Sequence, residues 1–321
     1  MTILITGVAG FIGSHLASKM LSQNFNVIGI DNLNDYYSVN LKKYRLKQLN
    51  KFKNFTFIKA DLSKALNLEK IIKKKKLSVI CHLAAQAGVR YSITNPSIYL
   101  KYNIDGFLNI LEYCRRYNTN LVYASSSSVY GANKKVPFSV NDDVSNPVSL
   151  YAVTKRSNEL MAESYFNLYK LNSIGLRFFT VYGPFGRPDM AYFSFTNALT
   201  KKKIITLNNE GKMYRDMTYI EDIVDGIIGA INYAMNSNNK IRNEIFNLGN
   251  DKPIKTTELL GKIESYFNQR AKTNIEYTEN ESLITHADIT KAKNLLGYDP
   301  KVSFEEGIKI FLDWHKHYEN L

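Results

Sequence analysis

Short apolar runs alternate with longer segments of helical spacing along the first half of the chain. The apolar runs predict strands at Thr2–Thr6, Asn26–Ile30, Phe55–Lys59, Ser78–Leu83, Leu121–Ala124 and Ser173–Phe179. The segments between them predict helices at Phe11–Ser22, Leu41–Leu49, Leu68–Lys74, Ile98–Tyr117 and Leu150–Leu171. Regular alternation of this kind predicts a doubly wound α/β fold, in which helices cover both faces of a parallel sheet.

After about residue 177 the alternation becomes less regular. Two glycines and two prolines between 183 and 188 interrupt the pattern, and helical spacing returns at Tyr219–Met235 and Thr256–Phe267. We therefore expect two domains. Residues 1–176 and 219–250 would form the domain with the parallel sheet, and residues 177–218 and 251–321 would form a smaller α/β domain that binds the substrate.

The composition fits an enzyme with a small, anionic ligand better than a nucleic-acid-binding protein. Of 321 residues, 45% are hydrophobic, and 42 Lys and Arg against 29 Asp and Glu give a formal net charge of +13. The lysines are scattered, with clusters only at 73–76 and 201–203, and no basic stripe is studded with aromatic residues. We therefore expect no nucleic-acid partner, while a sugar diphosphate would suit a basic site.

Two further absences bear on location and metal binding. Cys81 and Cys114 are far apart, which excludes a disulfide framework and favours a reducing compartment. No apolar run is long enough to span a bilayer, and the start is too short for a signal peptide. We expect a cytoplasmic protein without membrane contact. His315 and His317 lack Cys or acidic companions, so we expect no metal site.

The first strand runs into a glycine-rich loop with the spacing GxxGxxG, formed by Gly7, Gly10 and Gly13. Such a loop turns sharply and presents backbone N–H groups to a pyrophosphate at a helix N-terminus. Asp31 ends the second strand, where a carboxylate can bind the adenosine ribose, and no arginine follows it. The motif predicts a Rossmann-type domain that binds NAD rather than NADP. Further residues predicted to line this site are Phe11, Ile12, Asn32, Asp61, Leu62, Leu83, Ala84, Ala85, Gln86 and Asn103.

Tyr151 and Lys155 form a YxxxK motif at the start of a long predicted helix, where i,i+4 spacing puts both side chains on one face. A phenol with a pKa of about 10 is a poor base, but a nearby ammonium favours the phenolate. A second match at Tyr130 and Lys134 spans a glycine just past a strand, so its side chains should not align. Ser126 lies in a run of four serines that ends the fifth strand, and its hydroxyl can contact a reacting alcohol.

Seven segments together resemble the extended short-chain dehydrogenase/reductase family, and within it the NAD-dependent UDP-sugar 4-epimerases, closest to the UDP-glucuronate 4-epimerases. The resembling segments are 31–37, 87–92, 125–131, 149–155, 177–184, 186–190 and 215–220. The resemblance implies that Tyr151 is the base, that Lys155 holds the nicotinamide ribose, and that Ser126 contacts the sugar 4-hydroxyl. It assigns substrate contacts to Arg90, Ser127, Ser128, Thr180, Arg187 and Arg215, and it implies a homodimer paired through helices 98–117 and 150–171.

The implied reaction is C4 epimerisation of a UDP-hexuronate through a 4-keto intermediate. Thr180 and the nearby Arg187 suit a carboxylate, because arginine offers a fixed fork of donors. The family's 4,6-dehydratases carry Asp-Glu at Ser127 and Ser128, and its uronate decarboxylases carry Glu at Ser128, so the two hydroxyls argue against both reactions.

One stretch departs from the pattern. The epimerases carry a Gly-Asp pair ahead of Ala287, whereas this chain has the acidic stretch at 278–282. Two alternatives therefore stay open. They are epimerisation of a neutral or N-acetylated UDP-sugar and a non-catalytic NAD sensor. The family also suggests a role in polysaccharide biosynthesis.

Overall fold

The computed structural model describes residues 1–64, 68–72, 76–236, 242–278 and 282–318. Within these ranges, seven parallel strands form the main sheet in the order β10-β6-β5-β4-β1-β2-β3. The strands are β1 (Thr2–Thr6), β2 (Asn26–Asp31), β3 (Phe55–Lys59), β4 (Val79–His82), β5 (Asn120–Ser126), β6 (Ser173–Phe178) and β10 (Asn243–Leu248). The predicted Rossmann-type doubly wound sheet is thereby confirmed.

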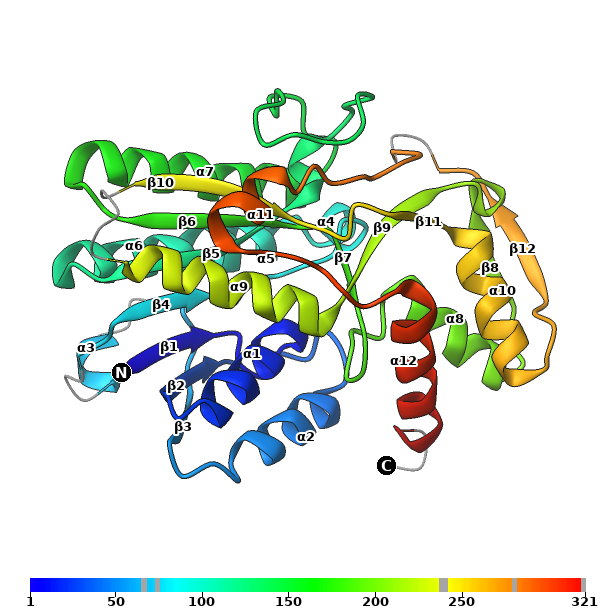
Figure 1. Cartoon of the computed structure of the whole chain (residues 1–321), viewed down its shortest axis with the longest axis horizontal. Helices are drawn as coiled ribbons and strands as arrows, with labels where there is room; N and C mark the ends of the chain where they lie inside the picture. Colours follow the sequence, from blue (N-terminus) through cyan, green and yellow to red (C-terminus); the bar gives the residue numbers. More distant parts are fainter. Residues whose placement is uncertain (65–67, 73–75, 237–241, 279–281, 319–321) are drawn as a thin grey trace.

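Alternation along each strand sorts its apolar side chains between two helical layers. Ile3 and Ile5 belong to the core cluster that includes helices α1 (Phe11–Ser22) and α9 (Ile220–Met235), whereas Leu4 belongs to the cluster under α6 (Gly106–Tyr117) and α7 (Leu150–Tyr169). Successive side chains of a strand point to opposite faces, so a continuous apolar run fills both layers. Figure 1 shows α9 crossing one face and α6 with α7 covering the other.

The helix predicted at 98–117 is interrupted by a wider turn. After α4 (Tyr91–Thr94) come α5 (Pro96–Tyr99), the π-helical turn η1 (Leu100–Asp105), and α6. The side chain of Asn103 in this turn is 1% exposed. The apolar periodicity did not predict the π turn, which is a single-turn insertion into a helix of a kind often found at functional sites.

The remaining strands build two small sheets beside the main one (Figure 1). One has the order β11-β9-β7 and the other pairs β12 with β8. Their strands are β7 (Thr180–Tyr182), β8 (Ile205–Asn208), β9 (Tyr214–Tyr219), β11 (Pro253–Lys255) and β12 (Thr273–Glu276). Helices α8 (Ala191–Thr200), α10 (Thr256–Phe267) and α12 (Phe304–Tyr318) pack against these small sheets, whereas α11 (Thr290–Leu296) packs against α9 and β10 of the main layer. Of the sequence-predicted helices, α2 begins earlier (Val39–Leu49), and α3 (Leu68–Ile71) ends before the predicted position 74, which lies outside the described residues.

Candidate active site

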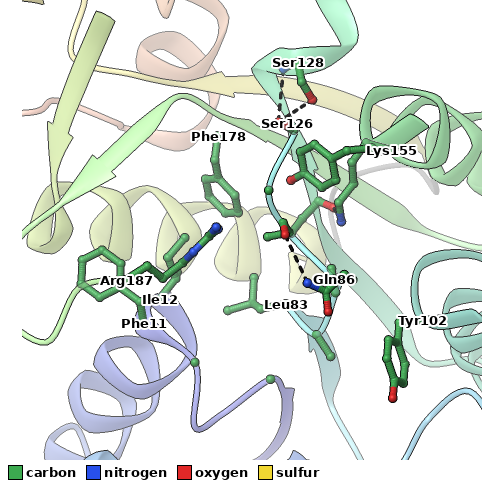
Figure 2. Close-up of a pocket in the computed structure, with 18 of the residues that line it drawn as sticks. Phe11, Ile12, Leu83, Gln86, Tyr102, Ser126, Ser128, Lys155, Phe178 and Arg187 are labelled. Carbon is green, nitrogen blue, oxygen red and sulfur yellow. Dashed lines mark hydrogen bonds between the residues drawn. The ribbon is translucent and has the colours of Figure 1, made fainter. Parts of the chain in front are cut away.

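A cavity of about 530 Å³ lies at the carboxyl ends of the parallel strands. It is lined by the loops that follow β1 and β4, by the ends of β2, β5 and β6, and by the start of α7. Ligands bind at this edge in open α/β sheets, and the volume suits a small molecule. Nearly all predicted site residues line this cavity, and Arg90 and Asn103 are the exceptions. Figure 2 shows Arg187 on one side of it, with Ser126 and Lys155 on the other.

The glycine loop after β1 leaves room for a pyrophosphate. Gly7 has a φ of 69°, and a Cβ on Gly13 would lie 2.2 Å from the Gly7 carbonyl oxygen. Any side chain at Gly13 would therefore push α1 away from the loop. The Asp31 carboxylate accepts hydrogen bonds from the N–H groups of Ala9 at 3.0 Å and Leu33 at 2.8 Å. These bonds aim the carboxylate at the cavity, so the residues present fit the dinucleotide that the loop implies.

The wall formed by residues 83–89 is held from behind by Asn103. Its side chain accepts from the Gln86 N–H at 2.7 Å and donates to the Gln86 carbonyl at 3.0 Å. It also donates to the Thr154 hydroxyl on α7. Asn103 does not itself line the cavity. The structure therefore gives Asn103 the task of fixing the backbone of Gln86, and direct contact with the cofactor stays a prediction.

Tyr151 and Lys155 lie one turn apart at the start of α7. Ser149 begins this helix by accepting a hydrogen bond from the Ala152 N–H at 3.1 Å. The Lys155 ammonium donates to the Ala124 carbonyl at 2.8 Å. Burial lowers the pKa of Lys155 to about 8, although Glu159 opposes this shift. Burial also raises the pKa of Tyr151, while a hydrogen bond with Ser126 and the charge of Arg187 act in the opposite direction.

Three hydroxyls face the same space at the end of β5. Ser126 accepts a hydrogen bond from the Ser128 hydroxyl at 2.9 Å and another from the Ser128 N–H at 3.2 Å, because the chain turns there into the short helix η2 (Ser127–Tyr130). Figure 2 shows this pair of contacts. Ser127 and Thr180, the latter on β7, line the cavity as well. These hydroxyls can bind a sugar hydroxyl or a carboxylate.

Arg187 enters the cavity from the loop between β7 and α8. Its Nε and Nη2 donate to the two carboxylate oxygens of Asp189 at 3.1 and 2.5 Å, and Tyr36 donates to Asp189 at 3.1 Å. The bidentate pair fixes the plane of the guanidinium. Asp189 and Tyr36 lie in two of the segments that resemble the epimerases, but their contact joins residues 153 positions apart.

Arg215 and Arg90 have different surroundings. Arg215 on β9 lines the cavity beside Ser282 and donates to the Ser282 carbonyl at 2.9 Å. The acidic stretch at 278–282 thus ends next to Arg215, but residues 279–281 lie outside those described. Arg90 is exposed at the start of α4 and does not line the cavity. Its predicted substrate contact stays a prediction.

Lys42 is a cavity residue that the sequence analysis missed. It is 5% exposed, and its ammonium donates to the backbone and side-chain oxygens of Asn34, both at 2.6 Å. The positive charge of Lys42 also favours the ionised form of Asp31 and so opposes the rise in its pKa that burial causes. No arginine follows Asp31 in the sequence, but the structure places the Lys42 ammonium at the edge of the cavity near the predicted ribose site. A lysine on a polar helix gives no sign in the sequence that it turns inward.

The second YxxxK match has a structural role. The Tyr130 hydroxyl donates to Asn247 at 2.7 Å and accepts from Arg177 at 3.0 Å, and Lys134 is exposed. Tyr130 does not line the cavity. Its hydroxyl is committed to contacts behind the site.

The profile of the family described as GDP-mannose 4,6 dehydratase matches residues 4–311. The chain is similar to Protein CapI of Staphylococcus aureus, with 45% identity over 99% of both chains. It is similar to UDP-glucuronate 4-epimerase 3 of Arabidopsis thaliana, with 43% identity over 99% of this chain and 77% of the relative. Among solved structures, a UDP-glucuronic acid 4-epimerase from Bacillus cereus, in complex with UDP-glucuronic acid and NAD, superposes with a TM-score of 0.91. It is 33% identical, and the match covers 99% of this chain and 100% of that one.

Proposed function

The chain belongs to the GDP-mannose 4,6-dehydratase family of extended short-chain dehydrogenases/reductases, and we propose that it is an NAD-dependent UDP-glucuronate 4-epimerase. The observation that supports a uronate as the substrate is that Arg187 and Thr180 line the same cavity as Tyr151. A base beside the sugar is common to the family. A guanidinium with hydroxyls suits a carboxylate in addition.

Within this family, the residues after Ser126 distinguish the reactions. A dehydratase needs acidic side chains to remove water across C5 and C6, but positions 127 and 128 are serines that line the cavity. Ser128 is bonded to Ser126 instead. A hydroxyl with a pKa far above neutral is a poor general acid or base. The site therefore supports inversion at C4 without loss of water, although the matching family is described by a dehydratase.

The reaction begins with proton transfer at the sugar 4-hydroxyl. Tyr151 takes this proton as a phenolate, Ser126 holds the hydroxyl by a hydrogen bond, and the Lys155 ammonium stabilises the negative charge. NAD, held by the glycine loop and Asp31, accepts hydride from C4 and later returns it. The 4-keto sugar turns over while Arg215 holds its diphosphate, hydride returns to the opposite face, and Tyr151 gives the proton back. Atoms and electrons balance, because the cofactor is regenerated.

A 4-keto uronate is prone to lose CO2, because its ketone is β to the C5 carboxylate. Loss requires the bond to the carboxylate to stand perpendicular to the carbonyl plane. Arg187, Thr180 and the hydroxyls of Ser127 and Ser128 are the groups that can hold the carboxylate away from that alignment. A charge-assisted hydrogen bond of about 1.5–3 kcal/mol changes a conformer ratio by one to two decades.

Product analysis of Arg187→Ala tests this assignment. The wild type should convert UDP-glucuronate to UDP-galacturonate with little CO2. Arg187→Ala should epimerise more slowly and release a larger fraction of decarboxylated 4-keto pentose, measured by NMR and a CO2 assay. Normal epimerisation of the uronate by Arg187→Ala would contradict the carboxylate grip. A wild type that ignores the uronate and inverts UDP-glucose or UDP-N-acetylglucosamine would replace the proposed substrate by a neutral one.

The enzyme acts as a homodimer in this proposal. Apolar side chains are exposed along one side of α6 and α7, where Leu108 is 40%, Leu160 49% and Leu168 67% exposed. An apolar helical face of this kind suits pairing with the same face of a second copy.

We also assign the enzyme to the cytoplasm and to polysaccharide precursor synthesis. Both cysteines are buried and free, which suits a reducing compartment. No helix in the described part of the chain is long and apolar enough to cross a membrane. The predicted division of labour, with NAD on residues 1–176 and 219–250 and the UDP-sugar on the rest, belongs to the same proposal.

A further inference from the structure

Arg45 on α2 is a buried arginine outside the cavity whose donors are all used. Its side chain is 3% exposed. The five N–H groups of a guanidinium can make five hydrogen bonds, and five are present. Their acceptors are the carbonyls of Ala9 (2.8 Å), Phe185 (3.1 and 2.5 Å) and Gly186 (3.1 Å) and the hydroxyl of Tyr37 (2.7 Å).

These acceptors belong to two functional segments. Ala9 lies inside the glycine loop, and its N–H donates to the Asp31 carboxylate. Phe185 and Gly186 lie immediately before Arg187. A single planar group therefore joins the loop predicted to hold the cofactor to the loop that carries the arginine in the sugar site. Ala9 is 36 positions from Arg45 in the sequence, whereas Phe185 and Gly186 are 140 and 141 positions away.

The 183–190 loop has a conformation that needs such support. Phe185 has a φ of 57°, which is unfavourable for a bulky side chain. Its ring stacks on Tyr44 with centroids 5.5 Å apart and packs against Trp314 at 4.9 Å. A Cβ on Gly186 would lie 1.9 Å from the Tyr192 hydroxyl oxygen. The loop is thus held between α2 and α12, and Arg45 fixes its carbonyls directly.

The charge of Arg45 has no carboxylate within ion-pair distance among the described residues. Burial of a cation without a carboxylate partner costs free energy, and in this structure only hydrogen bonds to carbonyls and a hydroxyl offset that cost. Removing Arg45 would leave several acceptors without donors at once. We expect the two loops that Arg45 joins to shift relative to each other, and Arg187 to be displaced with them.

We propose that Arg45 is a positioning residue that couples the cofactor loop to the carboxylate-binding loop and so contributes to selectivity for a uronate. The proposal rests on the proposed function, because it assumes that Arg187 binds the substrate carboxylate. Arg45 would touch neither substrate nor cofactor. Its effect would appear in the share of affinity that depends on the carboxylate.

Two ligands that differ by that carboxylate test the proposal. UDP-xylose lacks the carboxylate of UDP-glucuronate and otherwise has the same pyranose. Their dissociation constants are measured by calorimetry on NAD-loaded protein in a Tyr151→Phe background, which prevents turnover. The ratio of the two constants reports the contribution of the carboxylate. Arg187→Ala should lower the preference for the uronate about 10–100-fold, as expected for a lost charge-assisted hydrogen bond.

Arg45→Met should lower the same preference by about 5–20-fold, because displacement of a binding group by about 1 Å can cost up to 100-fold. It should also lower the NAD content after gel filtration. Lys43→Met removes a positive charge from an exposed position on the same helix and should change neither quantity. Arg45→Lys keeps the charge but cannot span both loops, so its preference should fall between those of wild type and Arg45→Met. If Arg45→Met does not fold, the same two dissociation constants are measured on Arg45→Lys.

The outcomes separate this proposal from the proposed function. If Arg45→Met weakens the binding of both ligands equally, or if Arg45→Lys keeps the full preference for UDP-glucuronate, Arg45 only supports the structure in general and the proposed coupling is wrong. An unchanged ratio in the Arg45 variants with a reduced ratio in Arg187→Ala would overturn only the coupling. An unchanged ratio in Arg187→Ala would overturn the carboxylate grip itself.

Discussion

Tyr151 and Tyr130 are each followed by a lysine four residues later, but the fold gives the two hydroxyls different surroundings. Tyr151 lines the cavity with Lys155, whereas Tyr130 is bonded to Asn247 and Arg177. Tyr151→Phe should lower kcat by at least about 10²–10⁴-fold, as is typical for loss of a general base. Product formation with UDP-glucuronate measures this effect.

Tyr130→Phe serves as the matched control. It should leave kcat within a few-fold of wild type. It should lower the free energy of unfolding by about 1–3 kcal/mol, because buried partners lose a hydrogen bond. Urea unfolding measures this change. A larger loss of kcat in Tyr130→Phe than in Tyr151→Phe would reverse the choice between the two motifs.

Lys155 gives the activity a predicted pH dependence. Burial lowers the pKa of this ammonium to about 8, so the charged form is lost as pH rises through that value. Without the charge, the Tyr151 phenolate is less stable. We expect kcat/KM, which reports the free enzyme, to fall on the alkaline side near pH 8. Lys155→Arg keeps its charge and should lose this alkaline limb, although its lower absolute rate is expected. An identical limb in Lys155→Arg would assign the ionisation to another group.

We expect cofactor retention to depend on the unit formed by β1, the glycine loop and α1. The reaction regenerates NAD in each cycle, so the purified protein should carry NAD without supplementation. Gly10→Asp should abolish this retention, because a Cβ there lies 2.9 Å from the Gly7 carbonyl and the added carboxylate would face the pyrophosphate. Release by denaturation and an enzymatic assay of the nucleotide measure the content. Finding only NADP, or a full content in Gly10→Asp, would contradict this assignment.

A buried ion pair joins α7 to β6 behind the site. Glu159 accepts from Arg177 at 2.8 and 2.9 Å and from the Ser125 hydroxyl at 2.6 Å. Burial alone would raise the pKa of Glu159, but hydrogen bonding and the charge of Arg177 outweigh it, so the pKa lies below its ordinary value of 4.5. The pair therefore contributes stability above the unfolded pKa, and this contribution is lost as pH falls through the folded pKa.

Glu159→Gln should lower the free energy of unfolding at pH 7 by about 3–5 kcal/mol, because it leaves the Arg177 charge buried without its partner. The difference from wild type should shrink as pH falls below 4.5, because the unfolded wild-type chain takes up a proton there before the folded carboxylate, whose pKa is lower. Chemical unfolding at several pH values measures both effects. A difference that stays constant down to pH 3 would exclude the ionised pair as its source.

The proposed dimer is a property of the whole molecule. Leu160 and Leu168 are spaced to lie on one side of α7, and both are largely exposed. Replacing both by Glu should convert a dimer to a monomer with NAD still bound, because charges would be buried at the interface. Light scattering after gel filtration measures the mass. A wild type with the mass of one chain would remove the proposed interface.

Features that depend on neighbours along the chain could be predicted from the sequence alone. Apolar runs of strand length predicted the parallel sheet, because a strand buried on both faces needs apolar side chains at every position. Glycine spacing predicted the loop after β1, since the required turn and close approach are local. The i,i+4 spacing placed Tyr151 and Lys155 on one helical face, which follows from helix geometry alone.

Which polar side chains are buried, and what they bind, depends on contacts that form only in the folded chain. Arg45 and Lys42 lie on a helix whose composition is that of an exposed surface, yet both are buried. The partners of Arg45 at 185 and 186, like the contact of Tyr36 with Asp189, come from across the chain. A buried charge is tolerated only where the fold delivers acceptors to it. Most of these acceptors are backbone carbonyls, which every residue carries, so nothing in the sequence distinguishes them.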